Sequence, residues 1–441
     1  MVTVLRNKPG VLEPENHANI TDALKVNVSI TGIDNARVMG GFAGHAQAAC
    51  FKSIFLSPFL KPNAHADLMS ISNRYMPSDF PIDIVYLWVN GNDANWRAKR
   101  RDAAQKLSPS TLDGMAVYGN VEGRFRDNDE LRYSLRALET FFPGHGHIYI
   151  VTDQQTPEWL HAAPGLTVVD HRDLIPAAHL PMFDSGNIES YIHRIPDLSE
   201  RYFYLNDDVF FGAPVRVNDW FWPGGVYVAW SDDAGVSDEP LRQDATSLEN
   251  ACRLSGQWLK NKFEQQTACA EWALHVVPHY QHTFRTFAHS PRPMLRSLLY
   301  ELEAQAPDMF SRVRSTVFRA WDKPTIVSDF VLRWALAHGV AKVRDYSHLY
   351  VSTGDADTSA QLDQLAARRG ALDFFCINDT TDDAQWFDAR LTRVRQTLQG
   401  MFTQPSRFEI NTLQKALSPR ANPRDKARAM PVLQLEPQSA D

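Results

Sequence analysis

The sequence has few cysteines, no long apolar run and no excess of basic charge. Its 4 cysteines are widely spaced in 441 residues and form no CxxC pair, so they indicate neither a zinc ribbon nor a disulfide framework. Because no run of about 18 apolar residues occurs, no transmembrane helix is expected. The first residues lack the apolar core of a signal peptide, and we therefore expect a protein of the reducing cytoplasm.

The overall composition is that of an acidic globular protein. A net charge of −7 disfavours a general nucleic-acid binder, which usually has a basic face. Hydrophobic residues make up 44% of the chain, which is enough for a sizeable core. We expect an N-terminal extension (1–79), a main domain (80–400) with an insertion near 225–282, and a C-terminal tail (401–441).

Strand-like and helix-like segments alternate after residue 80. Segment 82–89 is apolar at nearly every position, as in a strand covered on both faces, and segment 130–142 has apolar residues at helical spacing. This alternation predicts an α/β fold with a Rossmann-like, largely parallel sheet and helical additions. The other expected elements are strands at 147–153, 166–173 (ending in Asp170), 202–208 and 372–379, a helix in the insertion, and helices at 293–305 (Pro293 near its start) and 328–339 (Ser328 as N-cap, Gly339 at its end).

In segment 201–214, RYFYLNDDVFFGAP, two acids interrupt an aromatic run. A buried carboxylate is costly unless it is paired or bound to a metal. Asp207 and Asp208 therefore predict a divalent-cation site, and a tight turn between two strands is the alternative. Other predicted strands also end in polar residues, at the edge where parallel sheets bind ligands, and this favours a binding site there. These residues are Asn90, Asp93, Asp153 and Asp170.

Four long blocks follow one another in a fixed order. They are IDIVYLWVNGND (82–93), RFRDNDELRYSLRAL (124–138) continuing to FDSGNIE and YFYLNDDVFFGAP, the region from AHSP to FRAWDK (288–323), and CINDT (376–380). In these blocks the chain resembles the Stealth family, and the resemblance covers residues 81–385. This family includes bacterial capsular and exopolysaccharide phosphotransferases and the animal enzyme that adds N-acetylglucosamine-1-phosphate to lysosomal glycoproteins.

The resemblance implies a specific reaction. A hexose-1-phosphate passes from a nucleotide sugar, typically a UDP-N-acetylhexosamine, to a hydroxyl of a polysaccharide or oligosaccharide acceptor. UMP leaves, and the product is a phosphodiester in a capsular polysaccharide or exopolysaccharide. Two other functions stay open, namely a conventional metal-dependent glycosyltransferase that releases UDP and a carbohydrate-binding relative without activity. The basic segment 420–428 either is a solvated end of the chain or docks on an anionic polymer or peripherally on the inner face of the membrane.

The resemblance also implies a metal site. Mg²⁺ or Mn²⁺ held by Asp207 and Asp208, with Asn378 and Asp379 as partners, would neutralise the leaving UMP. An Asx turn at a strand end is the alternative for the second pair. Many relatives have a further acid after this pair, where the present chain has two threonines, and the ligand set at this end is therefore open.

His289 and Arg319 are the expected catalytic side chains beside Asp208. His289 lies in the block where the family has its catalytic histidine, and an imidazole is suited to accept the acceptor proton. Arg319 is suited to the phosphoryl oxygens, and a salt bridge with Asp322 is the alternative.

Three groups of residues are expected to bind the donor. The end of the first strand would hold the nucleotide, the start of helix 130–142 the diphosphate, and the loop before the acid pair the sugar. Core packing, first-turn acids and a helix N-cap are the respective alternatives. The residues are Trp88, Asn90, Gly91, Asp93, Arg126, Asp129, Arg132, Asp184, Asn187 and Glu189.

Overall fold

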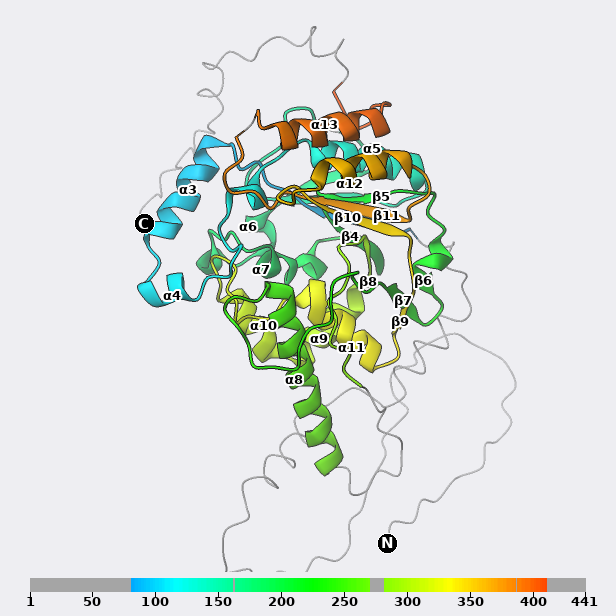
Figure 1. The fold of residues 1–441 in the computed structure, drawn as a ribbon. Coiled ribbons are helices and arrows are strands. Elements are labelled where there is room, and N and C mark those ends of the chain that lie inside the picture. The colour runs from blue at the N-terminus through cyan, green and yellow to red at the C-terminus, as the bar shows by residue number, and fades with distance from the viewer. Residues whose placement is uncertain (1–80, 162, 270–280, 386, 411–441) are drawn as a thin grey trace, which may run out of the picture. The chain divides into compact units, whose positions relative to one another are not determined.

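The computed structural model describes residues 81–161, 163–269, 281–385 and 387–410 (Figure 1). All of them belong to one compact unit within Leu60–Asp441. The expected N-terminal extension, part of the insertion and most of the tail lie outside the described residues, and so does the basic segment 420–428. Within the described ranges, none of the helices combines the length and the apolar composition needed to cross a bilayer.

A five-stranded sheet forms the centre of the fold. Its strands run in the order β3-β2-β1-β4-β8, and all neighbours are parallel except β4 and β8. The predicted α/β fold with a largely parallel sheet is therefore confirmed. The strands are β1 (Asp83–Leu87), β2 (Ile148–Thr152), β3 (Leu166–Asp170), β4 (Arg201–Asn206) and β8 (Arg292–Leu295).

The strand order places a topological switch between β1 and β4. From β1 the chain proceeds to β2 and β3 on one side, and β4 then returns to the other side of β1. Ligands of open α/β sheets bind at the carboxyl ends of the strands at such a switch. Every residue of β1 is buried, as the continuous apolar run in the sequence predicts.

A second, three-stranded sheet has the order β10-β11-β5, with β5 antiparallel to β11. Helices α12 and α13 lie over this sheet beside α5 (Figure 1), and stacked rings of Phe210 and Phe375, 4.7 Å apart, join its strands. The predicted strand 372–379 therefore belongs to this sheet and not to the central one. The elements are β5 (Val209–Phe211), β10 (His348–Ser352), β11 (Phe374–Asn378), α5 (Glu130–Phe141), α12 (Thr358–Ala367) and α13 (Ala389–Met401).

The other elements surround these two sheets. A third sheet consists of β6 (Phe221–Trp222), β7 (Gly225–Val228) and β9 (Ala341–Val343). The predicted helix of the insertion is α8, of which Figure 1 shows the far end extending away from the sheets. The helices are α3 (Ala94–Gln105), α4 (Pro109–Asp113), α6 (His171–Leu174), α7 (Ser185–Glu189), α8 (Ser247–Cys269), α9 (Arg296–Gln305), α10 (Pro307–Arg314) and α11 (Val331–Ala337).

Two predicted boundaries are wrong. Pro293 does not start a helix but lies in β8, and the helix begins at Arg296. A proline is tolerated there because β8 is an edge strand. The third strand ends at Asp170, as predicted, and the carboxylate of Asp170 caps α6 by accepting a hydrogen bond from the Arg172 amide.

Segment 328–339 also starts differently from the prediction. A π-helical turn, η6 (Ile326–Phe330), precedes α11, so Ser328 is not an N-cap. Its hydroxyl instead donates a hydrogen bond to Glu189 at 3.2 Å. Gly339 follows the helix with φ +70°, a left-handed conformation that favours glycine, as predicted.

Candidate active site

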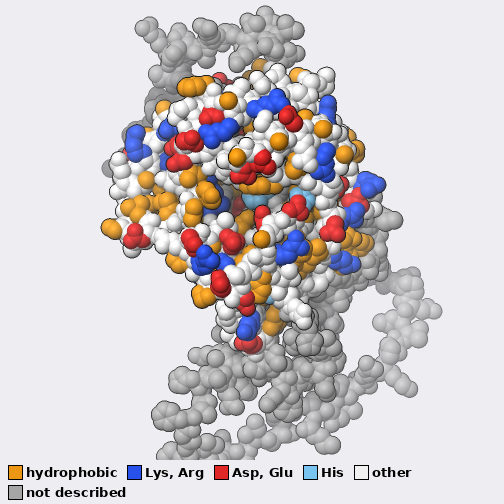
Figure 2. Space-filling model, in the orientation of Figure 1, with side chains coloured by type: hydrophobic (Ala, Val, Ile, Leu, Met, Phe, Trp, Pro, Cys, Tyr) orange, Lys and Arg blue, Asp and Glu red, His pale blue; other side chains and the backbone are white. Residues whose placement is uncertain are grey.

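The acid pair lies in the turn between β4 and β5, where the chain passes from the central sheet to the second sheet. Asp207 and Asp208 form the tight turn that was the alternative interpretation, and they also lie at the β1–β4 switch. The divalent-cation site stays a prediction. Figure 2 shows one face of the molecule, which is hollowed near its centre. Histidine and charged side chains of both signs lie around the hollow.

Asp208 is held by strand β11. The Ile377 amide donates to its backbone carbonyl at 3.0 Å, and the Cys376 thiol donates to its Oδ2 at 3.5 Å. Its other oxygen, Oδ1, is buried and has no hydrogen-bond partner among the described residues. Burial raises the pKa of Asp208 to about 6, although Cys376 and nearby arginines favour the charged form. An unpaired carboxylate oxygen of this kind needs a cation or a donor.

Further acids surround the pair. Burial, together with repulsion by Asp208 and Glu130, raises the pKa of Asp207 well above its usual range. Burial and the nearby Asp129 raise the pKa of Asp127 to about 6, and burial and Asp127 raise that of Glu130 to about 8. Asp127 was missed by the sequence reasoning, although it stands in the RFRDNDE block. The raised pKa values of these acids come first from burial and then from their mutual repulsion.

These residues fit a divalent cation only in part. Within the described ranges, no group of three or more His, Cys, Asp or Glu side chains is arranged to bind a metal. Mg²⁺, however, commonly takes one or two carboxylates together with substrate phosphates and water. The unpaired Oδ1 of Asp208, with Asp207 adjacent in the chain, meets that smaller requirement.

His289 is partly buried, and three arginines lie near it. Its Nδ1 has no hydrogen-bond partner in the described part of the chain, and its ring lies 5.3 Å from the ring of Tyr350. Burial and then the charges of Arg292 and Arg319 lower the pKa of His289 to about 4. The imidazole is therefore neutral at pH 7 and can accept a proton.

The three arginines come from different segments. Arg319 donates to the Ser185 hydroxyl and contacts Asp184 at 3.4 Å rather than the predicted alternative, Asp322. Arg124 also reaches Ser185, at 3.5 Å, and burial and the charge of Arg319 lower its pKa to about 9. The Nε atoms of Arg124 and Arg292 are buried without a hydrogen-bond partner within the described ranges.

Crowded guanidinium groups with unpaired N–H donors favour an anion. Arg124 and Arg292 were not singled out from the sequence. Each stands in a block that resembles the Stealth family, the first in RFRDNDE and the second just after AHSP. Position within those blocks is the signal that would have found them.

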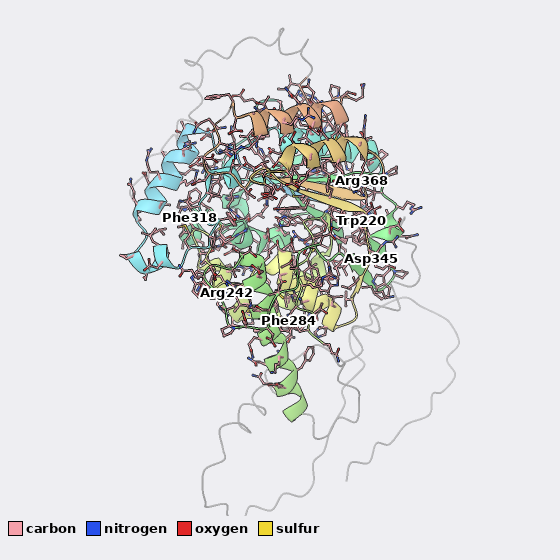
Figure 3. The ribbon with its side chains drawn as sticks, viewed as in Figure 1. Trp220, Arg242, Phe284, Phe318, Asp345 and Arg368 are labelled. Carbon is pink, nitrogen blue, oxygen red and sulfur yellow. The ribbon has the colours of Figure 1, made fainter. Side chains whose placement is uncertain are left out.

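An aromatic cluster fixes the segment that carries Arg319. Phe318 stacks on Phe183 with ring centres 5.1 Å apart, and Figure 3 labels Phe318 among the side chains of this region. Trp96 of α3 packs edge-on against the same Phe183. The segments before α7 and before Arg319 are thereby held together.

The three predicted sugar-binding residues are buried. Asp184 caps α7 and accepts from Thr316, while Asn187 donates to the Thr316 carbonyl at 2.8 Å. Glu189 accepts from Tyr204 at 2.9 Å, and burial raises its pKa. Asp184 and Glu189 lie close to Arg124 and Arg319, so these residues line the same centre from α7.

The predicted nucleotide-binding block has local structural roles. Trp88 packs in the main core, the Asn90 side chain closes a turn by accepting from the Asn92 amide, and Asp93 caps α3. Gly91 approaches the Phe125 backbone so closely that a Cβ would lie 2.2 Å from its carbonyl oxygen. The predicted role of this block in nucleotide binding is not tested by these contacts and stays a prediction.

The predicted diphosphate-binding arginines contact the C-terminal part of the domain. Arg126 pairs with Asp379 and donates to Thr381 at 3.0 Å, and Arg132 pairs with Glu409 at 2.6 Å. Both guanidinium groups are therefore engaged by acids.

The remaining predicted residues are also bonded within the protein. Asp379 accepts from Thr353 at 2.9 Å as well as from Arg126, and Asn378 donates to the Tyr350 hydroxyl at 2.8 Å. Asp129 precedes α5 in a left-handed conformation (φ +68°), and its amide donates to Asp127. A metal-binding role of the Asn378–Asp379 pair stays a prediction.

Three family models match this chain in order. Stealth protein CR1, conserved region 1, matches residues 80–108, conserved region 2 (CR2) matches residues 124–228, and conserved region 4 (CR4) matches residues 363–418. The chain belongs to the Stealth family. The three regions contribute β1, the β4–β5 turn and β11, which meet at the acid pair.

Curated relatives of this Stealth protein include an exopolysaccharide phosphotransferase of Streptomyces coelicolor, 35% identical over 70% of this chain and 31% of that protein. The exopolysaccharide phosphotransferase CpsY of Mycobacterium leprae is 33% identical over 75% of this chain and 57% of that protein. The chain thus spans less than two thirds of the length of these relatives. The chain also has a distant likeness to a solved structure of mouse xyloside xylosyltransferase 1. The two share 13% sequence identity with a TM-score of 0.32, over 67% of this chain and 98% of that one.

Proposed function

We propose that this Stealth protein is a sugar-1-phosphate transferase of exopolysaccharide or capsule synthesis. It takes hexose-1-phosphate, with an N-acetylhexosamine as the sugar, from a UDP-sugar and joins it to a hydroxyl of a saccharide acceptor. The relatives named exopolysaccharide phosphotransferases support the reaction class. The UDP-sugar donor and the release of UMP are inferred from the family resemblance.

The observation that carries the proposal is the position of His289 among the arginines. A neutral imidazole whose Nδ1 is unpaired can take the proton from the acceptor hydroxyl. The acceptor oxygen then bonds to the β-phosphorus while the bond from that phosphorus to the bridging oxygen breaks, and UMP leaves with the electron pair. Arg124, Arg292 and Arg319 stabilise the charge on the phosphoryl oxygens.

The acids of the β4–β5 turn complete this arrangement. Asp208, together with Asp207, would hold Mg²⁺ or Mn²⁺, and the ion would neutralise the charge of the leaving nucleotide. We leave Asp379 out of this ligand set, because it is engaged by Arg126 and two threonines. In the protein itself, β11 orients the Asp208 carboxylate through Cys376.

The identity of the released nucleotide tests the proposal. The purified protein is incubated with Mg²⁺, a panel of UDP-sugars labelled at the β-phosphate and a saccharide acceptor. We expect release of UMP and retention of the label in the saccharide product. Release of UDP carrying the label would establish a conventional glycosyltransferase instead.

A further inference from the structure

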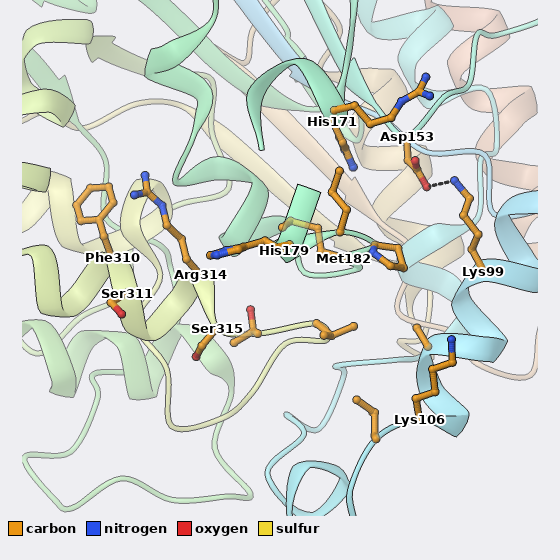
Figure 4. A pocket seen from close by; sticks show the side chains of 18 of the residues that line it. Lys99, Lys106, Asp153, His171, His179, Met182, Phe310, Ser311, Arg314 and Ser315 are labelled. Carbon is orange, nitrogen blue, oxygen red and sulfur yellow. Dashed lines mark hydrogen bonds and ion pairs between the residues drawn. The ribbon is translucent and has the colours of Figure 1, made fainter. Parts of the chain in front are cut away.

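A large cavity lies beside the candidate active site. Its volume is about 1050 Å³, and Asp153 and Gln154, which directly follow β2, form part of its wall (Figure 4). Lys99 of α3 and His171 of α6 project into it from one side, and Ser311 of α10 from the other. The cavity therefore opens at the carboxyl ends of the central strands, the edge that also carries the acid pair.

The cavity shares a wall with the candidate active site. Segments 181–185 and 315–319 run side by side, and the Phe183 amide donates to the Val317 carbonyl at 2.7 Å. Met182 and Thr316 from these segments line the cavity. Ser185 and Arg319, from the same two segments, contact each other in the arginine centre. These two segments thus separate a ligand in the cavity from the arginine centre.

Charge distinguishes the two spaces. In the cavity, Lys99 pairs with Asp153 at 2.5 Å, and Arg314 pairs with Glu303. Near His289, by contrast, the Nε atoms of Arg124 and Arg292 have no hydrogen-bond partner in the described part of the chain. The cavity wall also holds Lys106 together with Asp102. A nucleotide diphosphate needs positive charge with free N–H donors or a metal, so the arginine centre with its two unpaired Nε atoms suits it better than the cavity does.

The other groups in the cavity wall suit a sugar chain. Leu107, Leu180 and Pro181 line the cavity with partly exposed side chains and offer apolar surface to the C–H faces of sugar rings. The hydroxyls of Ser311 and Ser315 and the amide of Gln154 can bond ring hydroxyls as both donors and acceptors. Among the described residues, Phe310 and two histidines are the rings of this wall, and the buried Phe310 leaves little ring surface on which a nucleobase can stack.

We propose that this cavity binds a neutral saccharide segment of the acceptor polymer, next to the hydroxyl that receives the sugar phosphate. The inference rests on the proposed function for the identity of the polymer, but binding can be measured without any catalysis. Failure of one therefore does not imply failure of the other.

The test compares two tryptophan substitutions. Ser311→Trp fills the cavity from an exposed position on α10, and Ser110→Trp, at an exposed position of α4 outside the cavity, is the matched control. Binding of a panel of neutral tetrasaccharides (of glucose, galactose, mannose and N-acetylglucosamine) is measured by saturation-transfer NMR on the full-length protein. Binding of UDP with Mn²⁺ is measured in parallel, and circular dichroism confirms that each variant is folded.

We expect at least one tetrasaccharide to bind the unmodified protein and the Ser110→Trp variant. Its affinity should fall at least tenfold in Ser311→Trp, while UDP binding stays unchanged. Three results would overturn the inference: no tetrasaccharide binds at millimolar concentration, Ser311→Trp binds it normally, or Ser311→Trp loses UDP while UDP displaces the saccharide. The last result would assign the cavity to the donor.

Discussion

At the scale of single residues, charge compensation separates the functional groups from the structural ones. Most buried arginines of this protein meet a carboxylate, as Arg333 meets Asp329 at 2.8 Å. Unpaired buried groups are costly, and their concentration in one place points to a ligand that pairs with them. His289 Nδ1, Asp208 Oδ1 and two arginine Nε atoms are such groups within the described ranges.

Replacement of His289 by alanine should lower kcat by about 10²- to 10⁴-fold, the usual contribution of a general base. Because the imidazole has a pKa of about 4, its neutral form is available at all pH values well above 4. Loss of the base should therefore depress the rate across the neutral range, and added imidazole should restore part of it. A His289→Ala variant that keeps the rate of the unmodified protein across the neutral range would exclude the residue as the base.

Asp208→Asn should lower kcat at least about a hundredfold, because it removes a charge that would hold the cation against the diphosphate. It should also weaken Mn²⁺ binding, measured by electron paramagnetic resonance without any substrate. The asparagine can still accept a hydrogen bond from Cys376, so the turn should stay folded. Near-normal turnover and Mn²⁺ affinity would contradict the assignment.

At the scale of elements, periodicity predicts what lies within a segment, and distant contacts decide the rest. The run of β1 and the helical spacing of α5 are local patterns, and both elements occur where the sequence predicts them. A proline such as Pro293 is compatible with both a helix start and an edge strand. Pro293 lies in a strand because β8 pairs with β4. Nothing in the local sequence encodes that pairing.

In the candidate site, too, local sequence predicts some features, and contacts between distant residues determine the others. The acid pair and His289 stand in recognisable blocks, and the structure brings them together with Arg319 around one centre. Arg126 and Arg132 looked equally suited to phosphate. Their partners Asp379 and Glu409, however, lie 253 and 277 residues further along the chain, where spacing cannot reveal them. Sequence thus identified the chemical groups better than it assigned their partners.

Asp379→Ala should destabilise the contact between the loop before α5 and the end of β11. It leaves the buried Arg126 without its acid, and breaking a buried pair in this way costs about 3–5 kcal/mol. Urea unfolding should show this loss of free energy. Mn²⁺ affinity should stay within about twofold if Asp379 is not a ligand, and a large drop in affinity would restore it to the ligand set.

At the scale of the whole molecule, the C-terminal part of the described domain folds back onto helix α5. Helix α13 packs on α5, and Glu409 accepts hydrogen bonds from both Arg132 and Arg136 of that helix at 2.6 Å. Arg136 also donates to the Phe402 carbonyl at 2.7 Å. The C-terminal part of the described chain is therefore needed for the fold around the candidate site.

Glu409→Ala and Arg132→Ala distinguish closure of the domain from donor binding. Burial raises the pKa of Glu409, but the hydrogen bonds from Arg136 and Arg132 outweigh burial and lower this pKa below its usual value. Its stabilisation should therefore be complete above the unfolded-state pKa, near 4.5, and should disappear as the pH falls through the lower folded-state value. We expect Glu409→Ala to lower the free energy of unfolding at pH 7 by about 3–5 kcal/mol, and by progressively less in acid.

Arg132→Ala, which removes the more exposed partner, should cost about 1 kcal/mol and leave the KM for the UDP-sugar unchanged. A donor KM that rises tenfold or more in Arg132→Ala, with stability preserved, would instead place this arginine on the diphosphate.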